Sequence, residues 1–375
     1  MKNAIISFTV CLAICSTNAV AQRGKIQYFR PYDKSGLNVF ETTKEDTIGF
    51  AEFQLRLGAN FTQGFQTLKH ENQSGVALYP LYSGFPLAQA NLNIDAQLVD
   101  GVRVSLVSYM ASHHHNEFWV KGGYFQIDKV GFLNSETMNN IWKNLTLKIG
   151  HMEINYGDAH FRRSDGGNNL WNPFIENNIM DAFTTEIGAE VYWQRDGIIL
   201  MGGLSNGEIQ GSVTAGDRRG PSVYGKLGYD KVLADRTRVR ITASLLTKSS
   251  SVNGTLYGGD RTGSNYQFVM EPANATVTGN AFSGRYNPNF RDNVTAMMIN
   301  PFIKFQGLEF FGTLEFSEGN SAVENGEIQY TSPIITPNIM LKGEWVTQKY
   351  KDFPAGNIME GGKFEGFVVQ GSIGF

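Results

Sequence analysis

The stretch LNIDAQLVDGVRVSL at residues 92–106 decides the fold of this chain. From Leu92 to Leu98 apolar residues alternate with polar ones, and the alternation resumes after Asp100-Gly101. A period of two places the two kinds of side chain on opposite faces of a β-strand, whereas a helical period of 3.6 cannot separate them. An Asp-Gly pair between two such runs favours a tight hairpin turn. The stretch therefore predicts two antiparallel strands joined by a short turn.

The same alternation recurs along most of the chain. Between Phe53 and Phe61, for example, apolar residues again alternate with polar ones or glycine. We predict about 14 strands, within a range of 12 to 16, because transmembrane strands are about 9–11 residues long and alternate in this way. Pro333 and Pro337 flank the weak twelfth window, and Pro301 in the tenth predicts a bulge. The windows are 48–63, 87–99, 102–111, 117–128, 144–154, 185–195, 198–206, 221–230, 237–247, 295–305, 308–317, 325–334, 338–349 and 363–375.

The connections between these windows alternate in length. Long connections are expected at 64–86, 155–184, 207–220, 248–294 and 350–362, whereas most others span only a few residues. The exception is 129–143, where we expect one short helical turn. Long loops on one side and short turns on the other are typical of outer-membrane barrels. A secreted β-sandwich would also alternate, but it would need shorter, buried strands. The fold class we predict is all-β, a single transmembrane antiparallel β-barrel with long extracellular loops and short periplasmic turns.

Composition and the first residues agree with an exported protein. Lys2, the apolar run that follows and an Ala-x-Ala-like site predict a signal peptide at 1–21, and the remainder divides into a periplasmic N-terminal segment at 22–49 and the barrel at 50–375. Both cysteines, Cys11 and Cys15, fall in the leader; lipidation of Cys15 would need a small residue in place of Ile14. The net charge of −3 gives no reason to expect nucleic-acid binding, and no cofactor is expected.

Cationic residues on the polar face of the strands are the first candidates for contact with a solute. In a wide barrel this face lines water and tunes ion preference. Our inward-facing set leans cationic, which favours anionic solutes mildly. Its cations are Arg56, Arg103, Lys121, Lys148, Lys226, Arg238, Arg240, Lys304 and Lys342, and its acids are Glu52, Asp95, Glu190, Glu309, Glu315 and Glu344.

The loop 155–184 is the best candidate for a constriction of the lumen. It carries His160, Arg162, Arg163 and Asp165, and a pair of guanidinium groups offers fork-shaped donors to carboxylate or phosphate. The alternative is that the arginines pair with Asp158, Asp165 or Glu176 and only stiffen the loop. The solute-contact set we predict is Arg162, Arg163, His160, Asp165, Arg56, Arg103, Lys148 and Arg240.

Other residue clusters suggest rival functions. His113–His115 with Glu117 resemble a metal site, but adjacent histidines on an extended backbone do not all point at one ion. His160 with Asp158, Asp165 and Ser164 is the only local cluster typical of a barrel hydrolase, and no catalytic residue is expected. The loop 248–294 is rich in aromatic residues and could bind a sugar or a partner at the surface, or pack against neighbouring loops.

Several stretches resemble a porin-like family of Gram-negative outer-membrane proteins, distantly similar to the phosphate-selective porins O and P. They are GLNVFE at 36–41, LNIDAQLVDGVRVSL at 92–106, HHHNEFWVKGGYFQID at 113–128, GHMEINYGDAHFRRSDGG at 150–167, NPFIENNIMDAFTTEIGAEVYW at 172–193, NPFIKFQGLEFFGTLE at 300–315 and GGKFEGFVVQGSIGF at 361–375. The short stretch between Phe316 and Met340 departs from such relatives and favours fourteen strands over sixteen.

The resemblance implies an outer-membrane channel for passive diffusion of small hydrophilic solutes. It also implies recognition by the barrel assembly machinery through the terminal Phe375, insertion in outer-membrane lipid, and a homotrimer as one possible assembly. The rival readings are a surface-binding protein or a barrel hydrolase. The identity of the solute, the openness of the pore and the oligomeric state are not specified by the sequence.

Overall fold

The structure is a computed structural model that describes most of the chain. The described residues are 25–111, 117–172, 175, 180–209, 219–234, 236–258, 262, 264–280, 283, 287–306, 308–321, 327–336, 341–351 and 353–374. The expected leader at 1–21, the histidine cluster at 113–115, Glu176 and Phe375 therefore lie outside the described residues.

Fourteen strands form one sheet. Each predicted window overlaps one of them. The largest differences are in β1, which begins and ends later than expected, and in β10, which begins earlier. The strands are β1 Gln54–Glu71, β2 Gln89–Val99, β3 Val102–Met110, β4 Trp119–Ile127, β5 Leu145–Glu153, β6 Thr185–Arg195, β7 Ile198–Ser205, β8 Ser222–Ala234, β9 Thr237–Lys248, β10 Phe290–Phe305, β11 Leu308–Ser321, β12 Glu327–Thr336, β13 Leu341–Lys349 and β14 Lys363–Gly374.

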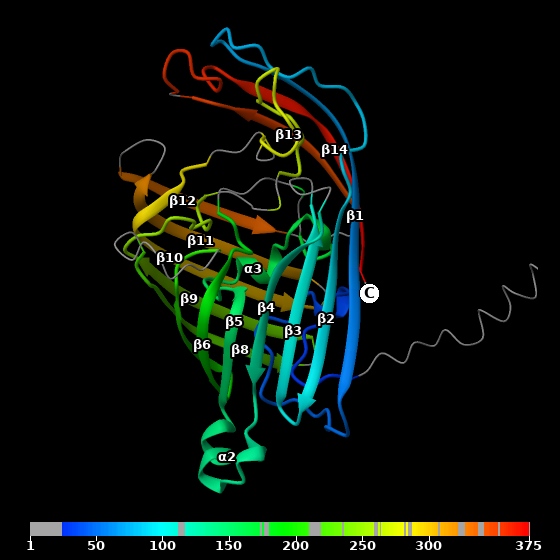
Figure 1. Ribbon diagram of the computed structural model, residues 1–375, viewed down its shortest axis with the longest axis vertical. Coiled ribbons are helices and arrows are strands. Elements are labelled where there is room, and N and C mark those ends of the chain that lie inside the picture. Colours follow the sequence, from blue (N-terminus) through cyan, green and yellow to red (C-terminus); the bar gives the residue numbers. More distant parts are fainter. Residues whose placement is uncertain are drawn as a thin grey trace, which may run out of the picture.

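Every neighbouring pair in the sheet is antiparallel, and the order follows the sequence except that β1 also pairs with β14. This pairing of the first and last strands, for example Asn60 opposite Gly374, bends the sheet around an interior. The edges of the sheet are β12 and β13, which are not paired with each other in the described part. Figure 1 shows the sheet curled around inner segments of the chain. The prediction of an all-β, antiparallel fold of about 14 strands is confirmed.

Short and long connections separate to opposite ends of the strands (Figure 1). At the short end, Gly101 between β2 and β3 has φ of +73°, and Asp196 and Gly197 between β6 and β7 also have positive φ. These are the conformations that two-residue hairpins need. The expected helical turn at 129–143 consists of a 3-10 turn, η3 at Gly131–Leu133, and the helix α2 at Glu136–Trp142.

The bulge predicted at Pro301 is wrong. Pro301 lies in regular register opposite Ile241 of β9, and the β10–β11 register is unchanged across it. The irregularity in β10 lies instead between Phe290 and Thr295. A proline lacks only one N–H group, so a strand can tolerate it wherever that donor is not required by its neighbour.

Burial along the strands is inverted relative to a water-soluble protein. In β1, Leu57 is 62% exposed and Leu55 is 53% exposed, whereas Asn60 on the opposite face is 2% exposed. In β2 the buried side chains are likewise polar, from Asn91 to Gln97. The apolar face predicted to meet lipid is therefore the outer face of the sheet, and the polar face is the inner one.

No helix in the described residues is long and apolar enough to cross a membrane.

Candidate functional site

Two inner segments of the chain lie in the interior of the curled sheet. The candidate site is formed by these segments together with the inner face of the strands. The first is residues 25–53 ahead of β1, and the second is the loop 154–184 between β5 and β6. Figure 1 shows the helix α3 of the second segment, Ala159–Arg162, inside the curl of the sheet. Both segments bind the polar inner face directly, through the contacts described below.

The first inner segment is tied to the sheet near its short-turn end. The Gln27 side chain donates to Asp100 Oδ1 at 2.9 Å, and Gln97 Oε1 accepts from the Gln27 backbone at 3.0 Å. Lys44 Nζ donates to the backbone oxygens of Asp128 and Leu145. The boundary at residue 50 stays a prediction. The described part of 22–49 packs against the inner face of the sheet, and its periplasmic place also stays a prediction.

The second inner segment crosses to the opposite wall. Asp165 caps the 3-10 turn η4, Gly166–Asn168, by accepting from Gly167 and Asn168, and it also accepts from Asn91 of β2 at 2.8 Å. Thr62 of β1 donates to the Gly167 carbonyl. The loop predicted to narrow the lumen therefore folds inward, as expected, although its role as a constriction stays a prediction.

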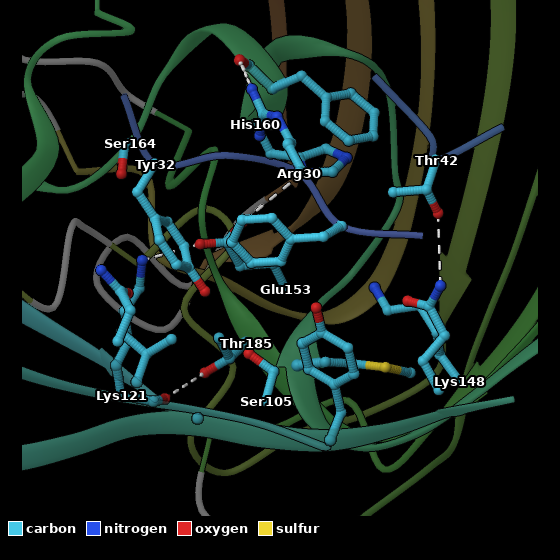
Figure 2. Close-up of a pocket in the computed structure, with 18 of the residues that line it drawn as sticks. Arg30, Tyr32, Thr42, Ser105, Lys121, Lys148, Glu153, His160, Ser164 and Thr185 are labelled. Atoms are coloured by element: carbon cyan, nitrogen blue, oxygen red, sulfur yellow. Dashed lines mark hydrogen bonds and ion pairs between the residues drawn. The ribbon is translucent and has the colours of Figure 1, made fainter. Parts of the chain in front are cut away.

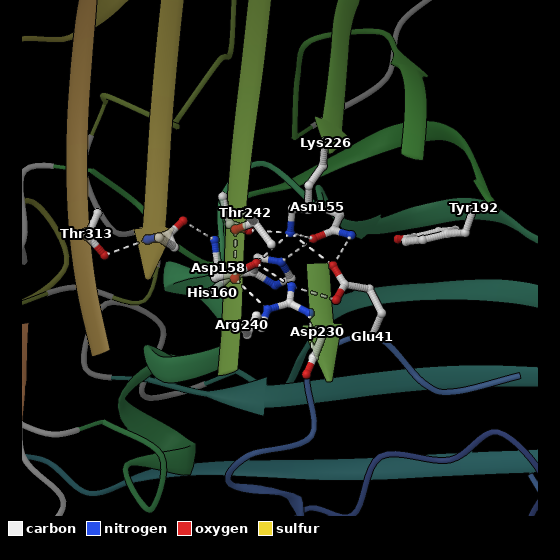
Figure 3. Close-up of polar contacts among 12 residues, drawn as sticks. Glu41, Asn155, Asp158, His160, Tyr192, Lys226, Asp230, Arg240, Thr242 and Thr313 are labelled. Atoms are coloured by element: carbon white, nitrogen blue, oxygen red, sulfur yellow. Dashed lines mark hydrogen bonds and ion pairs between the residues drawn. The ribbon is translucent and has the colours of Figure 1, made fainter. Parts of the chain in front are cut away.

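Four charged side chains join both segments to β8 and β9 (Figure 3). Arg240 binds Asp158 through two hydrogen bonds of 2.8 Å and contacts Glu41 at 2.7 Å. Lys226 contacts Asp158 at 2.9 Å and Glu41 at 3.1 Å. Asp230 of β8 also contacts Arg240, at 3.0 Å. Two cations and three carboxylates thus neutralise one another where little water reaches them, which makes the cluster costly to break.

Burial and partner charges set the protonation of groups in the inner segments. Burial alone would raise the pKa of the Glu41 and Asp158 carboxyls, but the Arg240 and Lys226 charges outweigh it and hold both pKa values below their usual range. Burial lowers the pKa of His160, so the imidazole is neutral at pH 7. Burial also lowers the pKa of the Arg30 guanidinium to about 9. At neutral pH the two acids and Arg30 are therefore charged and His160 is not.

Between the inner segments and the wall from β3 to β6 lies a cavity of about 190 Å³. Figure 2 shows cations and hydroxyl groups pointing into it from both sides. Its lining includes three of the predicted solute-contact residues, His160, Arg103 and Lys148. The other charged or aromatic lining residues are Phe29, Arg30, Tyr32, Phe40, Glu41, Lys121, Tyr124, His151, Glu153, Phe161, Trp171 and Tyr192.

The remaining five predicted residues are not in the cavity lining. Asp165 lies 3.0 Å from Lys121, Arg240 belongs to the charged cluster, and Arg56 lies over the Phe29 ring at 4.5 Å. Arg162 Nη1 lies 3.6 Å from Glu309 Oε2 and donates to Asn38. Arg163 donates to the Ser164 carbonyl.

The inward-facing set is confirmed for its buried members and wrong for Glu52. Arg103, Lys121, Lys226 and Arg240 are buried on the inner face, and so are Asp95, Glu190 and Glu315. Glu52 precedes β1 and is exposed. Lys304 lies on the same face of β10 as the buried Phe302 and contacts Glu309 at 3.0 Å, so it faces inward although its side chain is 41% exposed. The side chains of Lys342 and Glu344 lie outside the described residues.

Contacts of His160 do not form the catalytic cluster considered from the sequence, and the histidines of the candidate metal cluster, 113–115, lie outside the described residues. His160 Nε2 contacts Asn155 Oδ1 at 2.9 Å and Nδ1 lies 3.8 Å from Glu153, rather than bonding Asp158, Asp165 or Ser164. No group of three or more His, Cys, Asp or Glu side chains in the described part of the chain could hold a metal ion.

The aromatic residues of the loop 248–294 pack against other parts of the protein where they are described. Tyr257 donates to Glu315 at 2.5 Å, Tyr266 packs against Phe364 and Phe268 stacks on Tyr79 with ring centres 4.1 Å apart. Phe282 and Tyr286 lie outside the described residues. The packing alternative thus accounts for the described aromatic side chains, and a surface-binding role is not needed to explain them.

Sequence reasoning missed the contribution of the first inner segment to the site. Arg30 and Tyr32 lie in irregular chain, where no periodicity indicates which side chains face inward. Glu41 does fall within GLNVFE at 36–41, one of the stretches that carried the family resemblance. That resemblance was the one signal in the sequence for this segment.

Comparisons with known proteins give a likeness of fold only. No family model and no curated protein matches the sequence. Several solved structures match. OpdK from Pseudomonas aeruginosa matches with TM-score 0.29 and 9% identity over 85% of this chain and 99% of OpdK. A loop L8 deletion mutant of OmpT from Vibrio cholerae matches with TM-score 0.36 and 7% identity over 86% of this chain and 100% of that one. A BenF-like porin from Pseudomonas fluorescens Pf-5 matches with TM-score 0.34 and 8% identity over 87% and 100%.

Proposed function

We propose that this chain is an outer-membrane porin-like channel through which small hydrophilic, mainly anionic solutes diffuse passively. The observation that carries the proposal is the inverted burial of the strands, with Leu55 and Leu57 outside and Asn60 inside. Apolar side chains on the outer face of a curled sheet would be unfavourable in water and are favourable in lipid. Polar side chains inside suit a water-filled path.

The two inner segments make this a narrow path. A wide, general pore would leave the inner face solvated, but Arg240 and Lys226 are fully enclosed. The space that remains next to the inner face is the cavity lined by Arg103, Lys148 and His160. Solutes passing the sheet would therefore contact this cavity, and its cations favour an anion. Phosphate and organic acids are both candidates, because guanidinium groups offer fork-shaped donors to either.

The proposal also covers targeting and assembly. A leader at 1–21 would direct export, Phe375 would be read by the barrel assembly machinery, and the outer face would contact outer-membrane lipid, in a homotrimer or as a single barrel. Mass measurement of the detergent-folded protein distinguishes the two assemblies. Mass spectrometry of the mature N-terminus tests cleavage before Gln22. No catalytic step is proposed.

The experiment that tests the channel is a planar-bilayer recording of the refolded protein. We expect stepwise single-channel currents and, under a salt gradient, a reversal potential that indicates anion preference. Folding is checked independently by heat-modifiable migration on a gel. A folded barrel that stays silent in the bilayer would overturn the channel proposal and favour a surface-binding protein or a barrel hydrolase.

A further inference from the structure

The first inner segment contains a closed loop whose two ends meet beside the turn between β2 and β3. The Gln27 side chain donates to the Ile48 carbonyl at 2.7 Å, and its oxygen accepts from the Gly101 N–H at 2.9 Å. Gln27 is itself buried. The chain therefore leaves this point of the wall at residue 27 and returns to it at residue 48.

The far part of this loop reaches the opposite side of the sheet. The Asn38 carbonyl accepts from Arg238 of β9 at 2.6 Å, and the Asn38 side chain donates to Glu309 of β11 at 2.5 Å. In the sheet of fourteen strands, β9 is seven strands away from β2. Arg238 and Glu309 are each the second residue of their strand, next to a short turn. The loop therefore crosses the interior at the short-turn end.

Two neighbours of Asn38 strengthen the contact with the far wall. Phe40 is 2% exposed, and its ring packs edge to face against Phe161 of the second inner segment and Phe302 of β10. Glu41 joins the charged cluster. All of these contacts are non-covalent, whereas at the other side of the sheet the chain continues into β1. The loop is thus fixed at its ends and held at the far wall by contacts that can break and form again.

The charged cluster keeps other partners when Glu41 leaves it. Arg240 retains Asp158 at 2.8 Å and Asp230 at 3.0 Å, and Lys226 retains Asp158 at 2.9 Å. A buried cation left without any carboxylate would be costly. The far part of the loop can therefore separate from the wall without leaving either cation unpaired.

The loop also covers the cavity from the short-turn end. Its residues in the cavity lining are Phe29, Arg30, Tyr32, Phe40, Glu41 and Thr42. Its exposed residues include Lys34, Ser35, Thr43 and Glu45. A segment with some side chains on a cavity and others in solvent separates the two. Movement of its far part would join the cavity to the solvent at the short-turn end.

We propose that residues 27–48 form a hinged lid over the short-turn mouth of the channel. The hinge is the junction of Gln27 with Ile48, and the latch is Asn38, Phe40 and Glu41 at the far wall. Release of the latch moves the lid away from β9 and β11 and opens the cavity to the short-turn side. This inference rests on the proposed channel function and adds a conformational control to that path.

A reversible cross-link tests the lid in the full chain. In a background with Cys11→Ser and Cys15→Ser, the double variant Asn38→Cys/Glu309→Cys removes a latch hydrogen bond and places two thiols there. A bifunctional methanethiosulfonate bridges the thiols, dithiothreitol removes the bridge, and mass spectrometry verifies both steps.

We expect the bridge to act as a switch on single-channel currents. Without it, the variant should spend about tenfold more time than the wild type in its largest conductance level, because a hydrogen bond to a carboxylate is lost. With the bridge this level should be rarer than in the wild type, and reduction should restore it. Equal currents in the bridged and the reduced protein would overturn the lid.

The matched control is Glu71→Cys/Lys363→Cys in the same background. These two side chains also contact each other, at 3.0 Å, but they join β1 to β14, which are already paired along their length. Bridging this pair should leave the currents unchanged. If bridging the control pair changes the currents as strongly, the effect does not come from the lid and the inference is wrong.

Hydrogen exchange measures lid opening without any current. We expect the backbone amides of residues 33–44, read by mass spectrometry, to exchange at least about tenfold faster in Asn38→Leu than in the wild type. The comparison variant is Asn139→Leu in the exposed helix α2, which should exchange in 33–44 like the wild type. Unchanged exchange in a folded Asn38→Leu would overturn the lid.

The two readouts separate failure of the lid from failure of the channel. Faster exchange in folded barrels that all stay silent in the bilayer would retain the lid and overturn the channel proposal. Currents that do not respond to the bridge or to Asn38→Leu would leave the channel standing and overturn the lid. Phe40→Ala, which removes the apolar part of the latch, should act like Asn38→Leu in both measurements.

Discussion

Arg240 and Asp158 face each other as a buried fork, with Nε and Nη2 of the arginine donating to the two carboxylate oxygens at 2.8 Å. Both side chains are fully enclosed. Asp158 belongs to the loop 154–184 and Arg240 to β9, so the fork fixes the loop to the wall of the sheet. Glu41, which contacts Arg240 and Lys226, attaches the first inner segment to the same point. The two segments that fill the interior are therefore held by one charged cluster.

We predict that Asp158→Asn loosens both inner segments. The substitution removes one carboxylate from the two buried cations and leaves them with Glu41 and, for Arg240, with Asp230 at 3.0 Å. Breaking a buried pair in this way costs about 3–5 kcal/mol. The variant should lose heat-modifiable migration at lower temperature than the wild type and should show larger or noisier single-channel currents. Asp196→Asn, the same change in an exposed turn, is the control. Unchanged melting and conductance would show that the fork does not hold the loop.

The cluster should also set the acid limit of the protein. The pKa values of Glu41 and Asp158 are held below their ordinary values of 4.5 and 3.8 by Arg240 and Lys226 against the effect of burial. Groups with depressed pKa values stabilise the folded state above their ordinary pKa, and this contribution is lost as pH falls through the folded value. The contribution of these groups to the melting temperature should therefore be constant from pH 8 to about 5. The melting temperature should fall steeply below about pH 4.

Glu41→Gln provides the check on that assignment. It removes one titrating carboxylate, so its melting temperature should start lower at pH 7 and decline less below pH 4 than that of the wild type. The measurement is heat-modifiable migration across the pH series, with Glu136→Gln in the exposed helix α2 as the control. If the melting temperature of Glu41→Gln declines below pH 4 as steeply as that of the wild type, groups other than Glu41 cause the acid transition.

Ion selectivity should depend on the cavity rather than on the adjacent arginines of the loop. Arg162 is balanced by Glu309, and neither Arg162 nor Arg163 belongs to the cavity lining. Lys148 lines the cavity and is only weakly paired with Glu190. We therefore predict that Lys148→Ala shifts the reversal potential toward cations more than Arg162→Ala/Arg163→Ala does. The opposite ranking in a salt gradient would restore the sequence-based hypothesis.

The strands could be predicted from the sequence because their signal is local. Leu92 to Leu98 alternate in the sequence as they alternate in space, and Asp100-Gly101 supplies the turn that the hairpin needs. The pairing of buried charges could not be predicted from the sequence, because it is not local. Asp158, which pairs with Arg240, is in a distant loop, and Glu309, which pairs with Arg162, is in β11. Sequence neighbours such as Asp165 were plausible partners for Arg162 by proximity alone.

The first inner segment shows a second limit. A side chain such as Arg30 belongs to irregular chain, and only the tertiary contacts with Phe161 and Trp171 place it in the cavity. The polarity of the segment did not indicate its place inside the sheet, since a polar segment is as compatible with bulk solvent as with a polar lumen. In an inverted fold, burial of the interior is therefore harder to predict than burial of an ordinary apolar core.

The outer face itself can be tested by a single substitution. Leu57 lies within β1 and is 62% exposed, so Leu57→Arg would place a charge in the lipid if the sheet spans a membrane. A lipid-facing arginine costs about 2–4 kcal/mol near the bilayer midplane, whereas an exposed surface arginine in water costs little. We predict that the variant inserts poorly into liposomes, as read by protection from added protease. Phe85→Arg, at a loop position that is 77% exposed, should insert like the wild type. Equal insertion of the two variants would mean that this face of β1 does not contact lipid.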